Sequence, residues 1–158
     1  MKEVTDVIQS LEQLIAEVPA KFKRLSIEEI NHKPSPGKWS KKEILGHLCD
    51  SCFNNLHRII RVQYEEQPFI VYDQEEWVKR QNYRERDFDD VLDLWISLHR
   101  QFIHALKSFP ENHLNSLLDW GGEVTAQFVI TDYLDHHNHH LRQIFGNRIP
   151  GIDEISKP

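Results

Sequence analysis

Four long segments of this chain repeat apolar residues every three or four positions, which is the spacing of an amphipathic helix. They span residues 4–22, 40–64, 87–109 and 125–145. Proline or glycine follows most of them and marks where each helix should end. No alternating strand pattern and no internal repeat accompanies them. We therefore predict an all-α protein folded as a four-helix bundle, an architecture that builds metal sites between facing helices.

Two connections between these helices are long. Residues 23–39 contain a brief helical turn at 26–30 and then a loop rich in proline and glycine. Residues 67–86 mix apolar and polar side chains and are predicted to hold a second short helical turn. Such connections often form the rim of a functional site, and they allow crossovers, so a simple up-down-up-down order is not assumed. A turn at residues 120–123, flanked by very short extended pieces, precedes the last helix.

Short polar motifs mark the ends of the second and fourth long helices. Ser40 and Glu43 form a capping box, in which each side chain hydrogen-bonds the backbone amide of the other residue. Either Thr125 or Thr131 can cap the start of the fourth helix. Gly146 is its predicted stop, because glycine adopts the backbone conformation that ends many helices.

Length and composition fit one domain spanning residues 1–158. Apolar residues make up 39% of the chain and charged residues 28%, a balance typical of globular proteins. No apolar run approaches the roughly 20 residues of a membrane span, and the charged N-terminus does not resemble a secretory signal. We therefore expect a soluble, cytoplasmic protein. The net charge of −6 gives no electrostatic reason to expect a nucleic-acid or membrane partner.

The two cysteines, Cys49 and Cys52, form a Cys-x-x-Cys motif that suits a redox pair or half of a zinc site. The chain has no second cysteine pair, and no strand–helix context surrounds the motif. Both residues lie on the apolar side of a predicted helix, so we expect buried, reduced core residues.

Four of the ten histidines lie within residues 136–140 of the last predicted helix. His136 and His140 are four residues apart, so both imidazoles can point at one metal ion from one helix face. His137 lies near the middle of the apolar stripe, and His137 with His140 is an alternative pair. The spacing does not decide between the pairs, and a solvated face rich in histidine is a further interpretation. A metal site would also need another donor.

His47 lies on the second long helix, away from its apolar arc. It shares its side of the helix with polar residues, namely Glu43, Asp50, Ser51, Asn54 and Arg58. Taken alone, such a strip is typical of the solvent-exposed face of a helix. His99 and His104 on the third long helix have no partner there at ligand spacing, and structural roles are expected for both.

Three motifs occur in order along the chain: Lys38-Trp39-Ser40-x-x-Glu43, His47-Leu-x-Asp50 and His136-x-x-x-His140-Leu-x-Gln143-Ile144. Together they resemble the DinB/YfiT-like superfamily of metal-binding four-helix bundles, which includes the bacillithiol transferases. The resemblance extends over most of the chain, from the tryptophan before the second helix to the last helix. It rests on the order and the approximate separations of all three motifs, since any one of them alone would be weak.

The resemblance implies one metal ligand from the second helix and two, four residues apart, from the last. Carried over by motif, these are His47, His136 and His140. The resemblance thereby favours His136 over His137, and a ligand role for His47 over the solvent-exposed face. His139 is not assigned to the ligands. Three histidines suit zinc or nickel, with iron and manganese as further candidates.

An ion held in this way lowers the pKa of a bound thiol or water. The resemblance favours the thiol, so we expect a homodimeric enzyme that transfers a low-molecular-weight thiol, such as bacillithiol, to an electrophile. Asp50, one turn from His47, is the carboxylate expected to orient a ligand or move a proton, with a surface carboxylate as the alternative interpretation. Glu43 and Tyr133 are the other candidate bases. The alternative functions are metal-dependent hydrolysis and a non-catalytic metal-binding or stress-response bundle.

Overall fold

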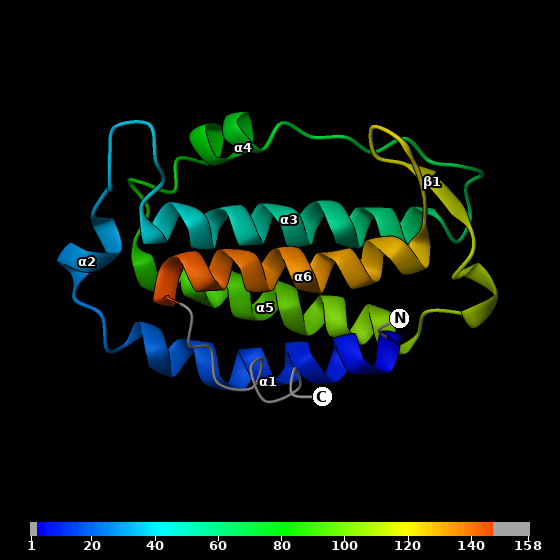
Figure 1. The fold of residues 1–158 in the computed structure, drawn as a ribbon, viewed down its shortest axis with the longest axis horizontal. Helices are drawn as coiled ribbons and strands as arrows, with labels where there is room; N and C mark the ends of the chain where they lie inside the picture. Colours follow the sequence, from blue (N-terminus) through cyan, green and yellow to red (C-terminus); the bar gives the residue numbers. More distant parts are fainter. Residues whose placement is uncertain (1–2, 147–158) are drawn as a thin grey trace.

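The computed structural model describes residues 3–146, and four long helices dominate it (Figure 1). These are α1 (Val4–Phe22), α3 (Lys41–Arg61), α5 (Phe88–Lys107) and α6 (Ala126–Phe145). The connections hold shorter elements: α2 (Ile27–Asn31), α4 (Gln74–Gln81), the 3-10 turn η1 (Glu111–His113), and a two-stranded antiparallel sheet of β1 (Leu117–Asp119) and β2 (Glu123–Thr125). The predicted all-α four-helix bundle is confirmed, as are the short extended pieces before the last helix.

The four long helices do not follow an up-down-up-down order. α1 contacts α5 and α6, and α3 contacts the same two helices, so α1 and α3 lie diagonally across the bundle. Figure 1 shows α3 and α5 running in one direction and α1 and α6 running in the other. Because α3 and α5 are parallel neighbours, residues 62–87 return along the length of the bundle before α5 begins. We call this segment the crossover; it carries α4, which packs against α3.

The helix ends form as the capping motifs predict. The Ser40 hydroxyl accepts from the Glu43 amide at 3.2 Å, and the Glu43 carboxylate accepts from the Ser40 amide at 2.8 Å. Thr125, rather than Thr131, caps α6 by accepting from the backbone amide three residues further on, at 3.1 Å. Gly146 follows the last residue of α6 with a φ of 82°, a left-handed value that favours glycine.

The polar strip of α3 is buried, so its interpretation as a solvent-exposed face is wrong. His47 and Asp50 are both 0% exposed. The crossover covers Asp50 and Arg58, whereas His47 is covered by Trp39 and by the histidines of α6. Arg58 donates two hydrogen bonds to the backbone carbonyl of Ile70 at 3.3 and 3.0 Å, and Tyr83 donates one to Asp50 at 2.7 Å. Helical periodicity alone cannot indicate that a second layer of chain covers a polar face.

The core lies between the long helices and includes both cysteines. Cys49 and Cys52 are 0% exposed and form no disulfide, which confirms the expectation of buried, reduced thiols. Burial raises the pKa of Cys52 to about 12, so this thiol stays protonated at neutral pH. Within residues 3–146, none of the helices combines the length and the apolar character that a membrane span requires.

Candidate metal centre

Three histidines from two helices converge between α3 and α6. His47 Nε2 lies 3.2 Å from His136 Nε2, which lies 3.1 Å from His140 Nε2. The candidate ligand atoms of all three residues lie within 4.8 Å of one another. Nitrogens bound tetrahedrally to one ion at about 2.0–2.1 Å would be roughly 3.3 Å apart, so the observed spacing fits a shared divalent ion. The structure therefore brings the three predicted ligands together.

Helical geometry explains this convergence. His136 and His140 are one turn apart on α6, and their ring centroids are separated by 4.5 Å. α3 packs against α6 in the opposite direction, which places the first turns of α3 beside the last turns of α6. Lys41, at the start of α3, donates to the backbone carbonyl of Ile144 near the end of α6. His47 consequently faces the two histidines of α6.

Burial favours the neutral form of all three imidazoles. Desolvation, reinforced by the neighbouring His140 and His136, lowers the pKa of His47 to about 3. Desolvation also lowers the pKa of His136 to about 4, and it lowers the pKa of His140. At neutral pH each ring therefore keeps one nitrogen lone pair, and this neutral form is the one that binds a metal ion.

Two side chains orient the rings. Gln143 Oε1 accepts from His140 Nδ1 at 2.8 Å, which leaves Nε2 of His140 as the nitrogen with the lone pair. The other end of the amide, Gln143 Nε2, donates to Nε2 of the exposed His139 at 3.2 Å. Trp39 covers His47, with ring centroids 4.9 Å apart. In the sequence Gln143 stands out only as part of a motif, although its spacing of three residues from His140 on a helix predicts the contact.

His137 points into the core instead of joining the group. Its ring stacks on Trp95 at a centroid distance of 5.6 Å and meets His99 edge-on at 4.6 Å. His99 Nδ1 in turn donates to the Trp95 carbonyl at 2.7 Å, and the Tyr133 hydroxyl donates to His99 Nε2 at 2.5 Å. The structure therefore places His137 and His99 in a buried aromatic cluster.

Asp50 is buried one turn along α3 from His47, so its interpretation as a surface carboxylate is wrong. Its Oδ1 accepts from the Tyr83 hydroxyl at 2.7 Å and from the Gln81 amide at 3.1 Å, whereas its Oδ2 has no hydrogen-bond partner among the described residues. Burial raises the pKa of Asp50 to about 6, although both hydrogen bonds oppose this shift. The carboxylate is not part of the three-histidine group. Tyr83 and Gln81 belong to the crossover, and no sequence motif indicated them.

The other two candidate bases have partners elsewhere. Glu43 accepts from the Ser40 amide and forms a salt bridge with Lys33 at 3.1 Å. Tyr133 is buried in the aromatic cluster, where its hydroxyl donates to His99. Neither side chain joins the three-histidine group.

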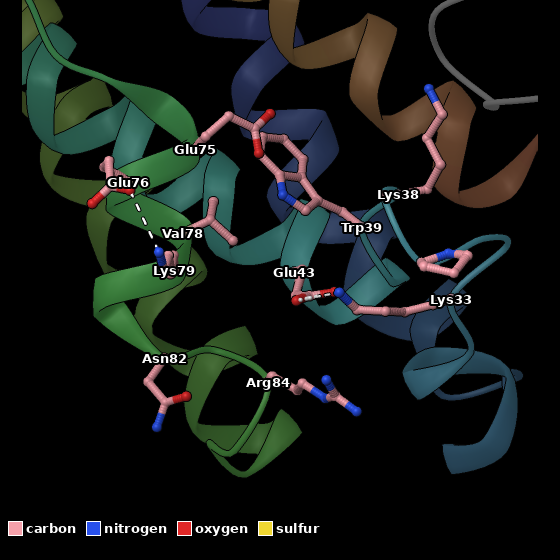
Figure 2. Close-up of a pocket in the computed structure, with 12 residues that line it drawn as sticks. Lys33, Lys38, Trp39, Glu43, Glu75, Glu76, Val78, Lys79, Asn82 and Arg84 are labelled. Atoms are coloured by element: carbon pink, nitrogen blue, oxygen red, sulfur yellow. Dashed lines mark ion pairs between the residues drawn. The ribbon is translucent and has the colours of Figure 1, made fainter.

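Two neighbouring cavities share Gly37, Lys38, Trp39 and Glu75 in their linings. The first has a volume of about 550 Å³, and His140 and Gln143 are among the residues that line it. The second, of about 410 Å³, is lined partly by the salt-bridged Lys33 and Glu43 (Figure 2). Only the first includes a histidine of the three-residue group in its lining. Its volume lies in the range of about 300–1,000 Å³ that is typical of small-molecule sites.

Comparison with known families matches residues 10–144 to the DinB superfamily. The chain belongs to the DinB superfamily. The matched range contains His47, His136 and His140 as well as the crossover, so the family assignment covers the whole candidate site.

Two bacterial relatives of this DinB protein are similar over most of its length, and the name of each describes a proposed metal-dependent hydrolase. YfiT of Bacillus subtilis strain 168 is 25% identical over 140 residues, which cover 84% of this chain and 79% of YfiT. BH0277 of Halalkalibacterium halodurans is 26% identical over 137 residues, which cover 82% of this chain and 80% of BH0277.

Solved structures share the fold of this DinB protein. The structure of Bacillus subtilis YfiT, described as having an unusual four-helix bundle topology, matches with a TM-score of 0.81 at 22% identity and covers 89% of this chain and 83% of YfiT. The structure of YjoA, a DinB-like protein from the same species, matches with a TM-score of 0.63 at 16% identity and covers 96% of this chain and 92% of YjoA. The parallel α3 and α5 therefore belong to a bundle topology that is known from YfiT.

Proposed function

We propose that this DinB protein holds a divalent ion, zinc or nickel, at His47, His136 and His140, and transfers a low-molecular-weight thiol of the bacillithiol type to an electrophile. The supporting observation is the donor set, in which no carboxylate joins the three imidazoles among the described residues. Neutral ligands leave the ion its full positive charge, which favours a bound thiolate. Metal-dependent hydrolysis commonly also uses a carboxylate base beside the metal, as in proteases with the His-Glu-x-x-His motif.

When bound, the ion would supply the positive charge that lowers the pKa of a thiol from its usual value of about 8.5. In the net reaction the thiol proton passes to solvent, the sulfur forms a bond to an electrophilic carbon, and the leaving group departs with the electrons of the broken bond. The chain contributes its neutral imidazoles, the orientation of His140 by Gln143, and the cavity beside His140 in which reactants can bind.

Metal-dependent hydrolysis is the second candidate function, and the names of YfiT and BH0277 favour it. Asp50 is the carboxylate that we would assign as its base, because Oδ2 has no partner in the described structure and the pKa of about 6 suits proton transfer near neutral pH. A non-catalytic metal-binding or stress-response bundle is the remaining alternative, and it predicts bound metal without turnover.

The proposal also includes a homodimer in the cytoplasm. The cytoplasm keeps small thiols reduced, as thiol transfer requires. Twofold homo-oligomers are the commonest assemblies of soluble proteins, and the exposed apolar side chains of Phe53 and Ile60 on α3 are available for contact with a second copy. Sedimentation equilibrium would test this part, and a monomer at micromolar concentration would refute it.

Metal analysis of the protein purified without an affinity tag tests the site. We expect about one ion per chain, lost in His47→Ala, His136→Ala and His140→Ala but retained in His137→Ala. Circular dichroism would check that each variant remains helical. Loss of the ion in His137→Ala alone, or no ion in the wild type after reconstitution, would refute the proposed ligands.

Turnover assays then separate the candidate functions. Thiol-dependent consumption of a chlorinated dinitrobenzene, absent in His47→Ala, would support thiol transfer. Cleavage of esters or amides without any thiol would favour hydrolysis instead. Stoichiometric metal with no turnover in either assay would favour the non-catalytic alternative.

A further inference from the structure

Two charged side chains in the cavity beside His140 have no partner of opposite charge. Lys38, in the loop before α3, and Glu75, in the first turn of α4, both line this cavity. Neither side chain takes part in a salt bridge or a side-chain hydrogen bond within the described part of the chain. One free positive charge and one free negative charge therefore face the same space, next to the three-histidine group.

Several neighbouring charged side chains are paired within the protein. Lys33 forms its salt bridge with Glu43 at 3.1 Å, and Glu76 pairs with Arg80 at 2.7 Å. Figure 2 shows Lys33 turned toward Glu43, whereas Lys38 extends away from that pair. Lys38 and Glu75 line both neighbouring cavities, and they are the two charged side chains that the His140 cavity includes.

The rest of the cavity lining fits a small ligand with both polar and apolar parts. Trp39 and Ile44 provide apolar surface, and Gln74 and Gln143 provide amide groups. His140 connects the cavity to the candidate metal centre. A ligand here can therefore reach the ion with one group while its charged groups contact side chains nearer the opening.

We propose that this cavity recognises thiols that carry both an ammonium and a carboxylate group, that is, thiols of the amino-acid class. Glu75 accepts hydrogen bonds from the ammonium group, and Lys38 donates hydrogen bonds to the carboxylate. This inference rests on the proposed function, because it places the thiol sulfur at the metal centre. It adds the substrate class and two specificity-determining residues that lie outside the metal ligands.

Charge complementarity explains the preference. A ligand with only a carboxylate would leave Glu75 uncompensated, and a ligand with only an ammonium group would leave Lys38 uncompensated. A ligand with both groups compensates both side chains. A ligand with a single charged group is also repelled by the side chain of the same charge. Glu75 also lies in the first turn of α4.

Calorimetric titration of the zinc-loaded protein tests the inference with four thiols that differ in charge: L-cysteine, N-acetylcysteine, cysteamine and 2-mercaptoethanol. The variants are Glu75→Gln and Lys38→Met. Their matched controls are Glu76→Gln, in the same first turn of α4, and Lys79→Met, since neither control position lines the His140 cavity. Each thiol is compared between wild type and variant, because the four thiols differ in acidity. Zinc content is measured after every titration.

We expect Glu75→Gln to weaken the binding of L-cysteine and cysteamine about two- to fivefold and to leave that of N-acetylcysteine and 2-mercaptoethanol unchanged, since Glu75 is exposed and exposed charge pairs contribute little. Lys38→Met should weaken L-cysteine and N-acetylcysteine by a similar factor and leave the other two unchanged. Both effects should shrink as the salt concentration rises. The control variants should bind all four thiols as the wild type does.

Other outcomes separate the two proposals. If the wild type binds thiols but neither variant changes the order of their affinities, the recognition proposal is wrong and the proposed function stands. Equal weakening of all four thiols, with loss of zinc, would show a structural effect and would also overturn the recognition proposal. If none of the four thiols binds the zinc-loaded wild type, both proposals fail.

Discussion

Replacing Gln143 by alanine should weaken metal binding although Gln143 is not a ligand. Its Oε1 accepts from His140 Nδ1 at 2.8 Å, and this contact selects the tautomer in which Nε2 of His140 carries the lone pair. The accepted hydrogen bond also makes the ring more basic and restricts its rotation. Without it, His140 must be oriented each time an ion binds, at a cost in free energy.

The expected loss follows from the exposure of this contact. Removing such an outer partner typically costs 10- to 100-fold in metal affinity, or about 1.4–2.7 kcal/mol. Gln143 is exposed, so water can partly replace its carbonyl, and we expect the lower end, about tenfold. Competition between the metal-free protein and a chromogenic zinc chelator at pH 7.5 would measure the dissociation constant directly.

Two further variants distinguish orientation from a general loss of structure. Gln143→Glu keeps an acceptor opposite His140 Nδ1 and should bind zinc at least as tightly as the wild type. His139→Ala removes the other partner of Gln143 and should change the affinity less than Gln143→Ala does. The reasoning is refuted if Gln143→Ala binds zinc as tightly as the wild type, or if Gln143→Glu is as weak as Gln143→Ala.

Three further predictions concern stability. A Cβ at Gly46 would lie 2.3 Å from the ring of Tyr83, so Gly46→Ala should lower the free energy of unfolding by about 1–3 kcal/mol in urea, whereas Gly37→Ala, with no atom within 4 Å, should not. Burial lowers the pKa of His99 to about 4. As the pH falls, the unfolded chain therefore takes up a proton at this side chain before the folded chain does. This histidine alone should reduce the free energy of unfolding of the metal-free protein by about 2 kcal/mol between pH 7 and pH 5. An unchanged urea midpoint over that range would contradict this expectation. The raised pKa of Asp50 has the opposite sign: its contribution to stability is present at low pH and is lost as the pH rises through about 6. Asp50→Asn should therefore raise the free energy of unfolding by about 3 kcal/mol at pH 8, with a smaller gain at pH 5, and equal gains at both pH values would refute the assignment.

The long helices could be predicted because their apolar spacing reflects burial in the bundle itself. The capping motifs were equally local, since Ser40 and Glu43 satisfy backbone groups within one turn. The choice between His136 and His137 could not be made from spacing, because both lie within one turn of His140. Only the position of α3 opposite α6 separates them, and that position depends on the packing of the whole bundle.

The burial of Asp50 had no signal in the sequence of α3. Tyr83 and Gln81 reach it from a connection about 30 residues later, and hydrophobic periodicity is blind to such long-range polar contacts. The same holds for Lys38 and Glu75, which lie far apart in the sequence and share a cavity only because the crossover passes beside the loop before α3. Polar residues from connections are therefore the part of this site that required the structure.

The residues of the candidate site lie in two parts of the fold, and a substitution would lower the stability of the protein by different amounts in the two parts. The proposed metal ligands lie on α3 and α6, where most neighbouring side chains are buried. Glu75 lies on α4, in which Val78 is the one buried residue. A substitution on the exposed face of α4 therefore removes few packing contacts, whereas one beside His47 or His140 affects both stability and metal binding. The proposed substrate preference can therefore change through the crossover while the three-histidine group is retained, and we expect Glu75→Gln to keep its zinc content for this reason.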